Sequence, residues 1–186
     1  MRVTHVITRL VVGGAQENTI ASVLGLRARP GLEVRLISGP TTGPEGSLEP
    51  LVAGVPGLFT RLPSLVRPVR PWADLRAWRE LTRTFRAQRP DLVHTHSGKA
   101  GILGRLAARR AGVPRIVHTV HGPSFGPFQG AAANALFTAA ERRAGRVTDR
   151  FVVVADAMTR QYLAAGIGRP GQYTRLLEAA ATPELG

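Results

Sequence analysis

Hydrophobic and polar positions follow two alternating periods along this chain, which predicts strands and helices in turn. The β-rich runs that we expect to form strands are residues 2–8, 33–38, 57–62, 91–95, 115–120 and 150–154. The segments with helical spacing of apolar residues are 15–27, 72–88, 99–111, 131–144 and 156–165. Ile20, Val23, Leu24 and Leu26 form the apolar stripe of the first helix, and Asp156 is expected to cap the last. Residues 39–50 are a loop by composition. Such alternation of strands and helices is typical of an α/β fold. We therefore expect a single Rossmann-like domain, with a doubly wound, mostly parallel sheet and helices on both of its faces.

Polar and small residues gather where two of the predicted strands end, in the strand–helix–strand segment 91–122. Parallel strands need a crossover of this kind, and ligands of open α/β sheets bind beyond the carboxyl ends of the strands. The residues at these ends are His94, His96, Ser97, Lys99, His121 and Gly122. This segment therefore predicts both the fold and the edge of the sheet where chemistry would occur.

Length and composition narrow the classes of protein. The chain has 186 residues, 44% of them hydrophobic, which fits one domain with a substantial core. It has no cysteine, so disulfides and thiolate metal sites are excluded. No apolar run approaches the roughly 20 residues of a membrane helix, and the first residues, MRVTHVIT, do not resemble a signal peptide. We expect a cytoplasmic domain.

The net charge of +13 comes almost entirely from arginine, since Lys99 is the only lysine among 25 basic residues. The basic residues are scattered and lack interleaved aromatic residues, so no nucleic-acid partner is expected. They are densest in the segment 61–89, whose field would attract anionic lipid headgroups or phosphorylated substrates. The apolar side of the predicted helix 72–88 is expected to pack against the sheet rather than against a membrane.

Two glycines, Gly13 and Gly14, lie between the first predicted strand and the first helix, where backbone amides can receive an anionic group. A glycine turn without a ligand is the alternative. The surrounding residues do not form a GxGxxG motif, and no acidic residue follows the second strand, where the sequence is Ile37-Ser38-Gly39. A dinucleotide site, and with it a nicotinamide dehydrogenase, is disfavoured.

The histidines and the single lysine each allow two interpretations. His94 and His96 face the same side of a strand, but no third ligand lies nearby in sequence, so no metal site is expected. Lys99 opposes the dipole at a helix N-terminus, which favours a bound anion, although a surface lysine is the alternative. His121 either projects into the cleft or bonds a backbone carbonyl as a cap.

Several motifs, taken in their order along the chain, resemble those of the N-terminal domain of family-4 glycosyltransferases of the GT-B fold. The resemblance covers residues 1–174. The motifs that carry it are Gly13-Gly-Ala-Gln16, Asp91-Leu-Val-His-Thr-His96 with Lys99-Ala-Gly101, Leu103-Gly-Arg-Leu-Ala-Ala108 with Ala111-Gly-Val-Pro114, Ile116-Val-His-Thr-Val-His-Gly122, and Phe151-Val-Val-Val-Ala-Asp156.

The resemblance implies transfer of a sugar, as by a hexosyltransferase, from a nucleotide-sugar to a glycan or lipid-linked acceptor. It also implies retention of the anomeric configuration without a metal or other cofactor, the nucleotide-sugar being a co-substrate. Gly13 and Gly14 would line the donor diphosphate, and Gln16 would border donor or acceptor. His121 would contact the transferred sugar as the catalytic-site histidine, and Gly122 would let it approach. Ser97 and Lys99 would lie on the acceptor side.

The family also implies a second, donor-binding domain, which should begin where this chain stops, at Gly186. The segment 175–186 does not resemble the family pattern. We therefore expect an acceptor-side domain at 1–174, an atypical tail at 175–186, and a donor-binding domain that is missing or supplied by a separate chain. A truncated, non-catalytic ligand-binding or interaction domain is the alternative. The expected location is the cytoplasm, with peripheral contact to the inner face of an anionic membrane.

Overall fold

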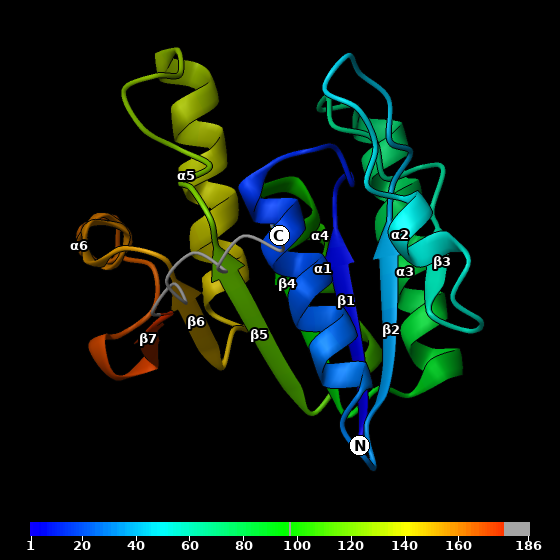
Figure 1. Ribbon diagram of the computed structural model, residues 1–186. Coiled ribbons are helices and arrows are strands. Elements are labelled where there is room, and N and C mark those ends of the chain that lie inside the picture. Colours follow the sequence, from blue (N-terminus) through cyan, green and yellow to red (C-terminus); the bar gives the residue numbers. More distant parts are fainter. Residues whose placement is uncertain (97, 177–186) are drawn as a thin grey trace, which may run out of the picture.

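Seven parallel strands form one sheet in the order β3-β2-β1-β4-β5-β6-β7 (Figure 1). The computed structural model describes residues 1–96 and 98–176. The strands are β1 (Arg2–Ile7), β2 (Glu33–Ser38), β3 (Phe59–Arg61), β4 (Leu92–His96), β5 (Arg115–Val120), β6 (Arg150–Val153) and β7 (Tyr173–Arg175). The parallel sheet confirms the predicted fold class, and the predicted run at 57–62 does contain a strand.

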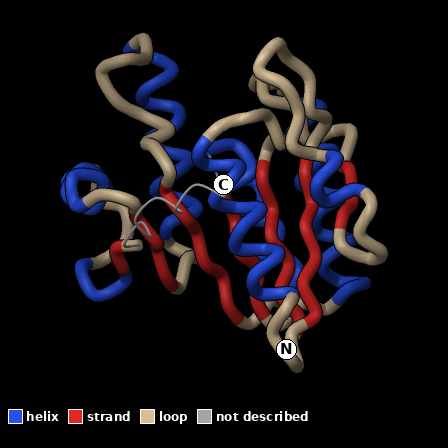
Figure 2. Tube along the Cα trace, viewed as in Figure 1, coloured by secondary structure: helices blue, strands red, loops and turns tan. Residues whose placement is uncertain are grey.

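Helical crossovers connect the strands (Figure 2). They are α1 (Gly14–Arg27), α2 (Pro50–Ala53), α3 (Pro71–Gln88), α4 (Gly98–Ala111), α5 (Ala131–Gly145), α6 (Asp156–Ala164) and the 3-10 helix η1 (Pro170–Gln172). The five long helices fall where the apolar spacing predicts them, to within a residue or two. The short elements α2, η1 and β7 are too brief to leave a periodic signal and were not predicted.

Successive side chains of β1 divide between the two faces of the sheet, because strand residues alternate. Val6 packs with Leu81 and Phe85 of α3 and Ala107 of α4 in one core. Ile7 packs with residues of α1 and β2 in a second core on the other face. Helices therefore cover both faces, as the doubly wound pattern requires, and the apolar side of α3 is confirmed as core rather than surface.

The strand order reverses between β1 and β4, since the chain runs outward from β1 through β2 to β3 and then returns to β4 on the other side. In open α/β sheets this reversal is where loops diverge and a ligand crevice opens. The register places His5 beside His94, and His96 beside Thr119. His5, His94 and His96 therefore share one face of the sheet, and His121, directly after β5, contacts His96 from the same side. His118 of β5 lies beside Thr95 and faces the other way.

Several local expectations were wrong. Leu24, predicted in the apolar stripe of α1, is 37% exposed, so the stripe is narrower than its spacing suggested. Asp156 does not cap α6: Ala155 holds the cap position without a side-chain bond, and the Asp156 carboxylate accepts a hydrogen bond from Arg175 Nη1 at 2.9 Å. Residues 177–186 of the predicted tail lie outside the described residues, whereas Arg175 belongs to β7.

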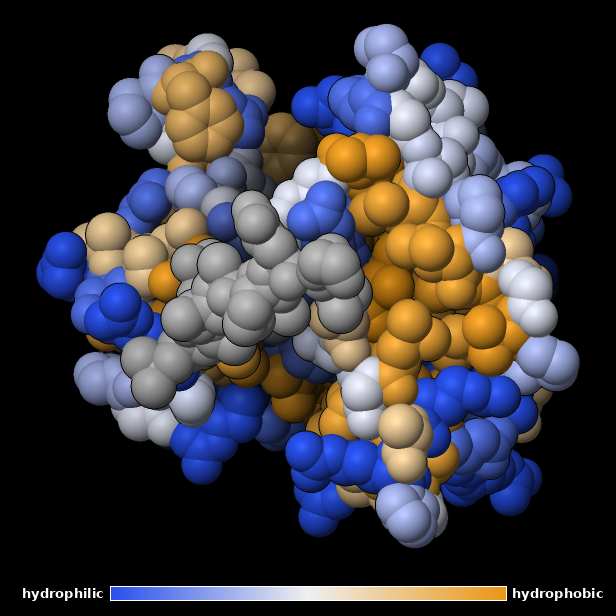
Figure 3. Space-filling view, viewed as in Figure 1, coloured by the Kyte–Doolittle hydropathy of each residue, from blue (hydrophilic) through white to orange (hydrophobic). Residues whose placement is uncertain are grey.

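Apolar surface forms a band over α1 and α2, and hydrophilic residues gather at the lower end of this face (Figure 3). A notch separates α5 from the loops that follow β1 and β2 at the carboxyl edge of the sheet. Among the described residues, no helix combines the length and apolarity needed to cross a bilayer.

Candidate functional site

A polar pocket of about 450 Å³ lies at the carboxyl edge, where the strand order reverses. Three loops and three helices (α1, α4 and α5) contribute to its wall. Its lining residues are Thr8, Arg9, Gln16, Arg67, Gly98, Lys99, Ser124, Gln129 and Phe137. Of the residues predicted from the sequence, this pocket brings together Gln16 and Lys99, which are 83 positions apart in the chain.

The glycine turn begins α1 beside this pocket. The carbonyl of Gly13 accepts hydrogen bonds from the amides of Gln16 and Glu17, both at 3.0 Å. Gly14 and Ala15 are the first residues of the helix, so their amides have no carbonyl within it to bond and can meet an anion. A Cβ on Gly13 would lie 3.1 Å from Gln16 Oε1, whereas one on Gly14 would meet nothing within 4 Å. A side chain at position 13 would therefore crowd Gln16. The backbone of Gly13 is extended rather than left-handed, so its conformation does not itself require glycine.

Lys99 does not stand alone at the start of α4. Its ammonium pairs with the Asp74 carboxylate in the first turn of α3 and donates to the Pro68 carbonyl. Asp74 also accepts a hydrogen bond from the Arg70 amide at 3.1 Å. The negative charge of Asp74 offsets the unfavourable position of Lys99, so that position does not by itself require a bound anion. The pair instead holds the start of α3 against the pocket.

Arg9 and Arg67 bring further positive charge to the rim. Arg9 forms an ion pair with Glu45 at 3.6 Å and donates to the Thr42 carbonyl at 3.1 Å. These contacts tie the predicted loop 39–50 to the segment after β1. The exposed Arg67 lines both this pocket and an adjoining hollow of about 320 Å³ that contains Arg9 and Arg70. An anionic group at this rim would therefore meet more than one guanidinium.

The histidines form a cluster that sequence spacing alone did not reveal. His5 Nδ1 lies 3.0 Å from His96 Nε2, and His96 Nδ1 lies 3.2 Å from His121 Nε2. His94 Nε2 lies 2.7 Å from Thr119 Oγ1. His5 was missed because its place beside β4 depends on the strand order, and no local motif marks it.

Burial sets the protonation of these rings. It lowers the pKa of His5 to about 4 and holds the pKa values of His94 and His96 well below the ordinary range. Burial also lowers the pKa of His121, which is only half-buried. The cluster is therefore neutral at pH 7. His5, His94 and His96 offer ligand atoms within 4.8 Å of one another, so His5 supplies a third potential metal ligand, which no residue close to His94 and His96 in the sequence provides.

A buried ion pair supports the loop after His121. Arg105 Nη2 on α4 donates to Glu141 Oε2 on α5 at 2.6 Å, and both side chains are fully buried. The other oxygen, Glu141 Oε1, accepts a hydrogen bond from Ser124 Oγ at 2.8 Å. Since Ser124 lines the pocket, this chain of contacts fixes the pocket wall to two helices. The burial of Arg105 could have been predicted from the sequence, because Arg105 lies three residues from both Ile102 and Ala108 on the buried side of its helix.

Not all predicted site residues meet in the pocket. Gly122 is exposed and a Cβ there would meet nothing within 4 Å, so it leaves open space beside His121. His121 joins the histidine cluster and does not line the 450 Å³ pocket. Ser97 lies outside the described residues.

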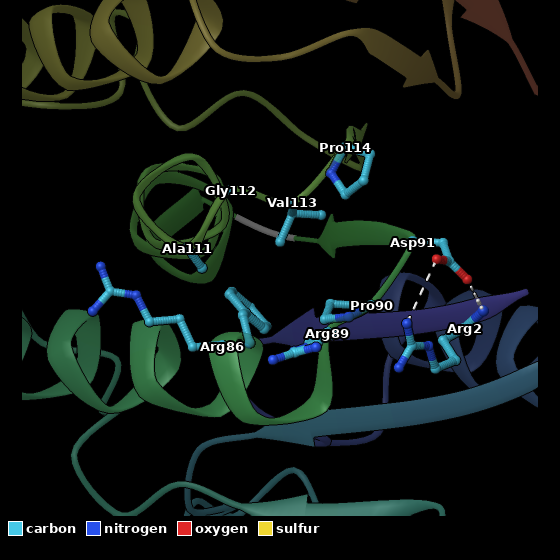
Figure 4. A pocket seen from close by; sticks show the side chains of 10 residues that line it. Arg2, Arg86, Arg89, Pro90, Asp91, Ala111, Gly112, Val113 and Pro114 are labelled. Carbon is cyan, nitrogen blue, oxygen red and sulfur yellow. Dashed lines mark hydrogen bonds and ion pairs between the residues drawn. The ribbon is translucent and has the colours of Figure 1, made fainter.

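A second hollow, of about 490 Å³, lies at the opposite edge of the sheet, where α3 and α4 end (Figure 4). Asp91 holds this edge together: its Oδ2 accepts from the Arg2 amide at 2.6 Å, and its Oδ1 lies 3.8 Å from Arg2 Nη2. That backbone hydrogen bond is the main reason why the pKa of Asp91 is lowered. Because this hollow faces the amino ends of the strands, it is on the wrong edge for a ligand site of this fold.

An open parallel sheet, with a polar pocket at the reversal of its strand order, defines a Rossmann-like ligand-binding domain. The chain belongs to the glycosyl transferase 4-like domain family, whose model matches residues 13–176. The predicted resemblance to family-4 glycosyltransferases is thereby confirmed.

A galactosyltransferase resembles this chain in sequence, and two solved structures resemble it in fold. Over 91 residues the chain is 38% identical to the Escherichia coli UDP-Gal:alpha-D-GlcNAc-diphosphoundecaprenol alpha-1,3-galactosyltransferase, a match that covers 49% of this chain and 24% of that protein. The fold matches the lipopolysaccharide outer core galactosyltransferase WaaB with a TM-score of 0.67 at 10% identity, over 94% of this chain and 45% of WaaB. It also matches the UDP-GlcNAc 2-epimerase of Methanocaldococcus jannaschii, with a TM-score of 0.65 at 9% identity, over 94% and 45% of the two chains. The chain thus spans less than half the length of these proteins.

Proposed function

We propose that this domain forms the acceptor-side half of a glycosyltransferase that moves a sugar from a nucleotide-sugar to a lipid-linked acceptor. The observation that carries the proposal is the match of a glycosyltransferase family to a chain whose polar pocket lies at the reversal of its strand order. The galactosyltransferase relative is named for a diphosphoundecaprenol-linked acceptor, which supports the lipid-linked class.

In the proposed reaction, the bond between the anomeric carbon and the diphosphate oxygen of the donor breaks. A hydroxyl oxygen of the acceptor forms the new bond to that carbon, with retained configuration, and its proton leaves with the departing diphosphate. Negative charge grows on that diphosphate, so preorganised amides and cations would stabilise it. The first amides of α1 at Gly14 and Ala15, with Arg9 at the rim of the pocket, would supply them. No metal or other cofactor is required in this scheme.

The remaining site residues would bind and orient the two substrates. His121, at the end of β5, would contact the transferred sugar, with Gly122 leaving room for it. Gln16 would border the sugar or the acceptor, since it lines the pocket directly after the glycine turn. Lys99, braced by Asp74, would lie on the acceptor side, as would Ser97.

The start of α3 would meet an anionic membrane. Trp72 is 85% exposed and Val69 is 52% exposed, and the exposed Arg67 and Arg70 flank them. An exposed tryptophan among arginines suits the headgroup region of a bilayer. Lys99 on the pocket wall pairs with Asp74, which lies in the same first turn of α3 as Trp72. The pocket would therefore open beside the membrane and receive a lipid-linked acceptor.

Binding of the nucleotide-sugar donor would require a further domain. Since the chain spans less than half the length of its structural relatives, we propose that a second α/β domain, in the same polypeptide or in a separate chain, binds the nucleotide. Without that domain, the pocket described here would bind the acceptor but would not complete transfer.

The test combines the purified chain with radiolabelled nucleotide-sugars and an isoprenoid-diphosphate-sugar acceptor. One series adds the protein encoded next to this chain and the other omits it. Labelled lipid product is expected only where a donor-binding domain is present, and a His121→Ala chain serves as the site control. Absence of transfer and of donor hydrolysis in both series, with acceptor binding retained, would replace the proposal with a non-catalytic ligand-binding domain.

A further inference from the structure

Three imidazoles form a hydrogen-bonded chain from the interior of the sheet to its carboxyl edge. It begins at His5 in β1, crosses His96 in β4 and ends at His121 after β5, with nitrogen–nitrogen distances of 3.0 and 3.2 Å. The ring planes are inclined by 14° in the first pair and 28° in the second. His5 is 0% and His96 1% exposed, so only the His121 end approaches the surface.

The number of protons on three neutral rings restricts which nitrogen donates in each of the two hydrogen bonds. A neutral imidazole has one N–H donor and one bare acceptor nitrogen. His96 uses both nitrogens, so it must donate to one neighbour and accept from the other. Only two neutral arrangements satisfy both bonds. Either every ring is protonated at Nδ1 and donation runs from His5 to His121, or every ring is protonated at Nε2 and donation runs the opposite way.

The inner end of the chain distinguishes these arrangements. His5 Nε2 is buried, and it has no hydrogen-bond partner within the described part of the chain. In the second arrangement it would be a buried N–H without an acceptor, a rarer defect in folded proteins than an unpaired acceptor. A free histidine side chain favours the Nε2–H form, so Nδ1–H in all three rings would be imposed by this site.

We propose that His5 and His96 are positioning residues, which fix His121 as the Nδ1–H tautomer with its Nε2 held by His96. His121 then offers a hydrogen-bond donor, not a base, to a bound group. That group must carry an acceptor oxygen, such as a sugar hydroxyl. The sugar contact rests on the proposed function, whereas the tautomer follows from the three hydrogen-bonded histidines alone. His94 stays outside the chain, because its Nε2 bonds Thr119.

Long-range proton–nitrogen correlation NMR on the ¹⁵N-labelled full chain tests the tautomer without any ligand. At about pH 7.5, above the ordinary histidine pKa, we expect protonated Nδ1 and bare Nε2 in His5, His96 and His121. Protonated Nε2 in any of the three would overturn the proposal. One zinc ion per chain, found by metal analysis and bound through the His5, His94 and His96 group, would also overturn it.

Substitutions then test the transmission along the chain. His5→Leu removes the first donor, so the His121 nitrogen shifts should move toward a mixture of tautomers although His121 is two rings away. His5→Asn keeps an amide donor close to the Nδ1 position and should restore the wild-type shifts. Thr119→Val, which removes the partner of His94, is the matched control and should leave His121 unchanged. Unaltered His121 shifts in a folded His5→Leu protein would refute the positioning role.

The outcome is separable from that of the proposed function. If the Nδ1–H chain is found but no sugar is transferred in the reconstituted enzyme, the positioning holds and the glycosyltransferase proposal fails. If His5→Leu does not fold, the tautomers of the wild-type chain still decide the proposal.

Discussion

Glu141 of α5 accepts a 2.6 Å hydrogen bond from Arg105 of α4, and neither side chain has any exposed surface. This contact joins two crossover helices beneath the loop that carries Ser124. A fully buried charge is costly unless it is paired, so each partner depends on the other.

We expect Arg105→Met to lower the free energy of unfolding by about 3–5 kcal/mol, because it leaves the Glu141 carboxylate buried without its partner. Arg109→Met is the matched control, since Arg109 lies on the exposed side of the same helix and should change stability by no more than about 0.5 kcal/mol. Urea titrations followed by circular dichroism measure both. Equal effects would mean that the pair is not the stabilising contact.

The close approach of α4 to the sheet depends on Gly101. A Cβ there would lie 2.4 Å from His118 Cε1, a buried ring held by Thr95 at 2.9 Å. Gly101→Ala should therefore cost about 1–3 kcal/mol through overpacking. Gly25→Ala, in α1 with open space around it, should instead stabilise by about 0.5–1 kcal/mol. Thermal denaturation of the two variants would show opposite shifts, and destabilisation by both would contradict this packing.

Stability should fall as the pH falls through the range from about 6.5 to 4. His5 has an ordinary pKa of 6.5 when unfolded but about 4 when folded, so in this window the unfolded state binds more protons. Above pH 6.5 both states are neutral at this ring and the effect vanishes. The loss from His5 alone is about 3 kcal/mol. Denaturant midpoints across this range measure it, and a His5→Asn protein should show a shallower dependence.

Activity should depend on His121. In a form that contains a donor-binding domain, His121→Ala should reduce turnover at least about tenfold, equivalent to about 1.4 kcal/mol of barrier. The half-buried position of His121 predicts that the fold survives. Initial rates of sugar transfer, with circular dichroism as the check on folding, test this expectation. Unchanged turnover would reduce His121 to a structural residue.

Membrane contact should depend on Trp72. Trp72→Ala should weaken partitioning onto phosphatidylglycerol vesicles at least about fivefold, or about 1 kcal/mol, because it removes the exposed aromatic residue at the start of α3. Leu51→Ala is the control, since Leu51 is 58% exposed but lies on α2. Sedimentation with vesicles compares the two, and an equal loss in both would point to general hydrophobic adsorption.

The sequence predicted what depends on local periodicity and chain order. The long helices and most strands follow from apolar spacing, and the carboxyl-edge location of His94, His96 and His121 follows from where their strands end. The His5 contact could not be predicted in this way, because it needs β1 and β4 to be neighbours at a particular register. The Lys99–Asp74 pair has the same origin, since it joins two helices whose packing no sequence spacing specifies. Those long-range pairings are decided by the assembled sheet.

The sheet narrows toward both margins, because β3 (Phe59–Arg61) and β7 (Tyr173–Arg175) each have three residues and each ends in arginine. Outer strands expose unpaired backbone groups, on which a second molecule could add its own strand. Edge strands this short offer few backbone groups to a second molecule, and their terminal arginines repel those of an identical copy. The chain should therefore resist strand-mediated self-association even at high protein concentration.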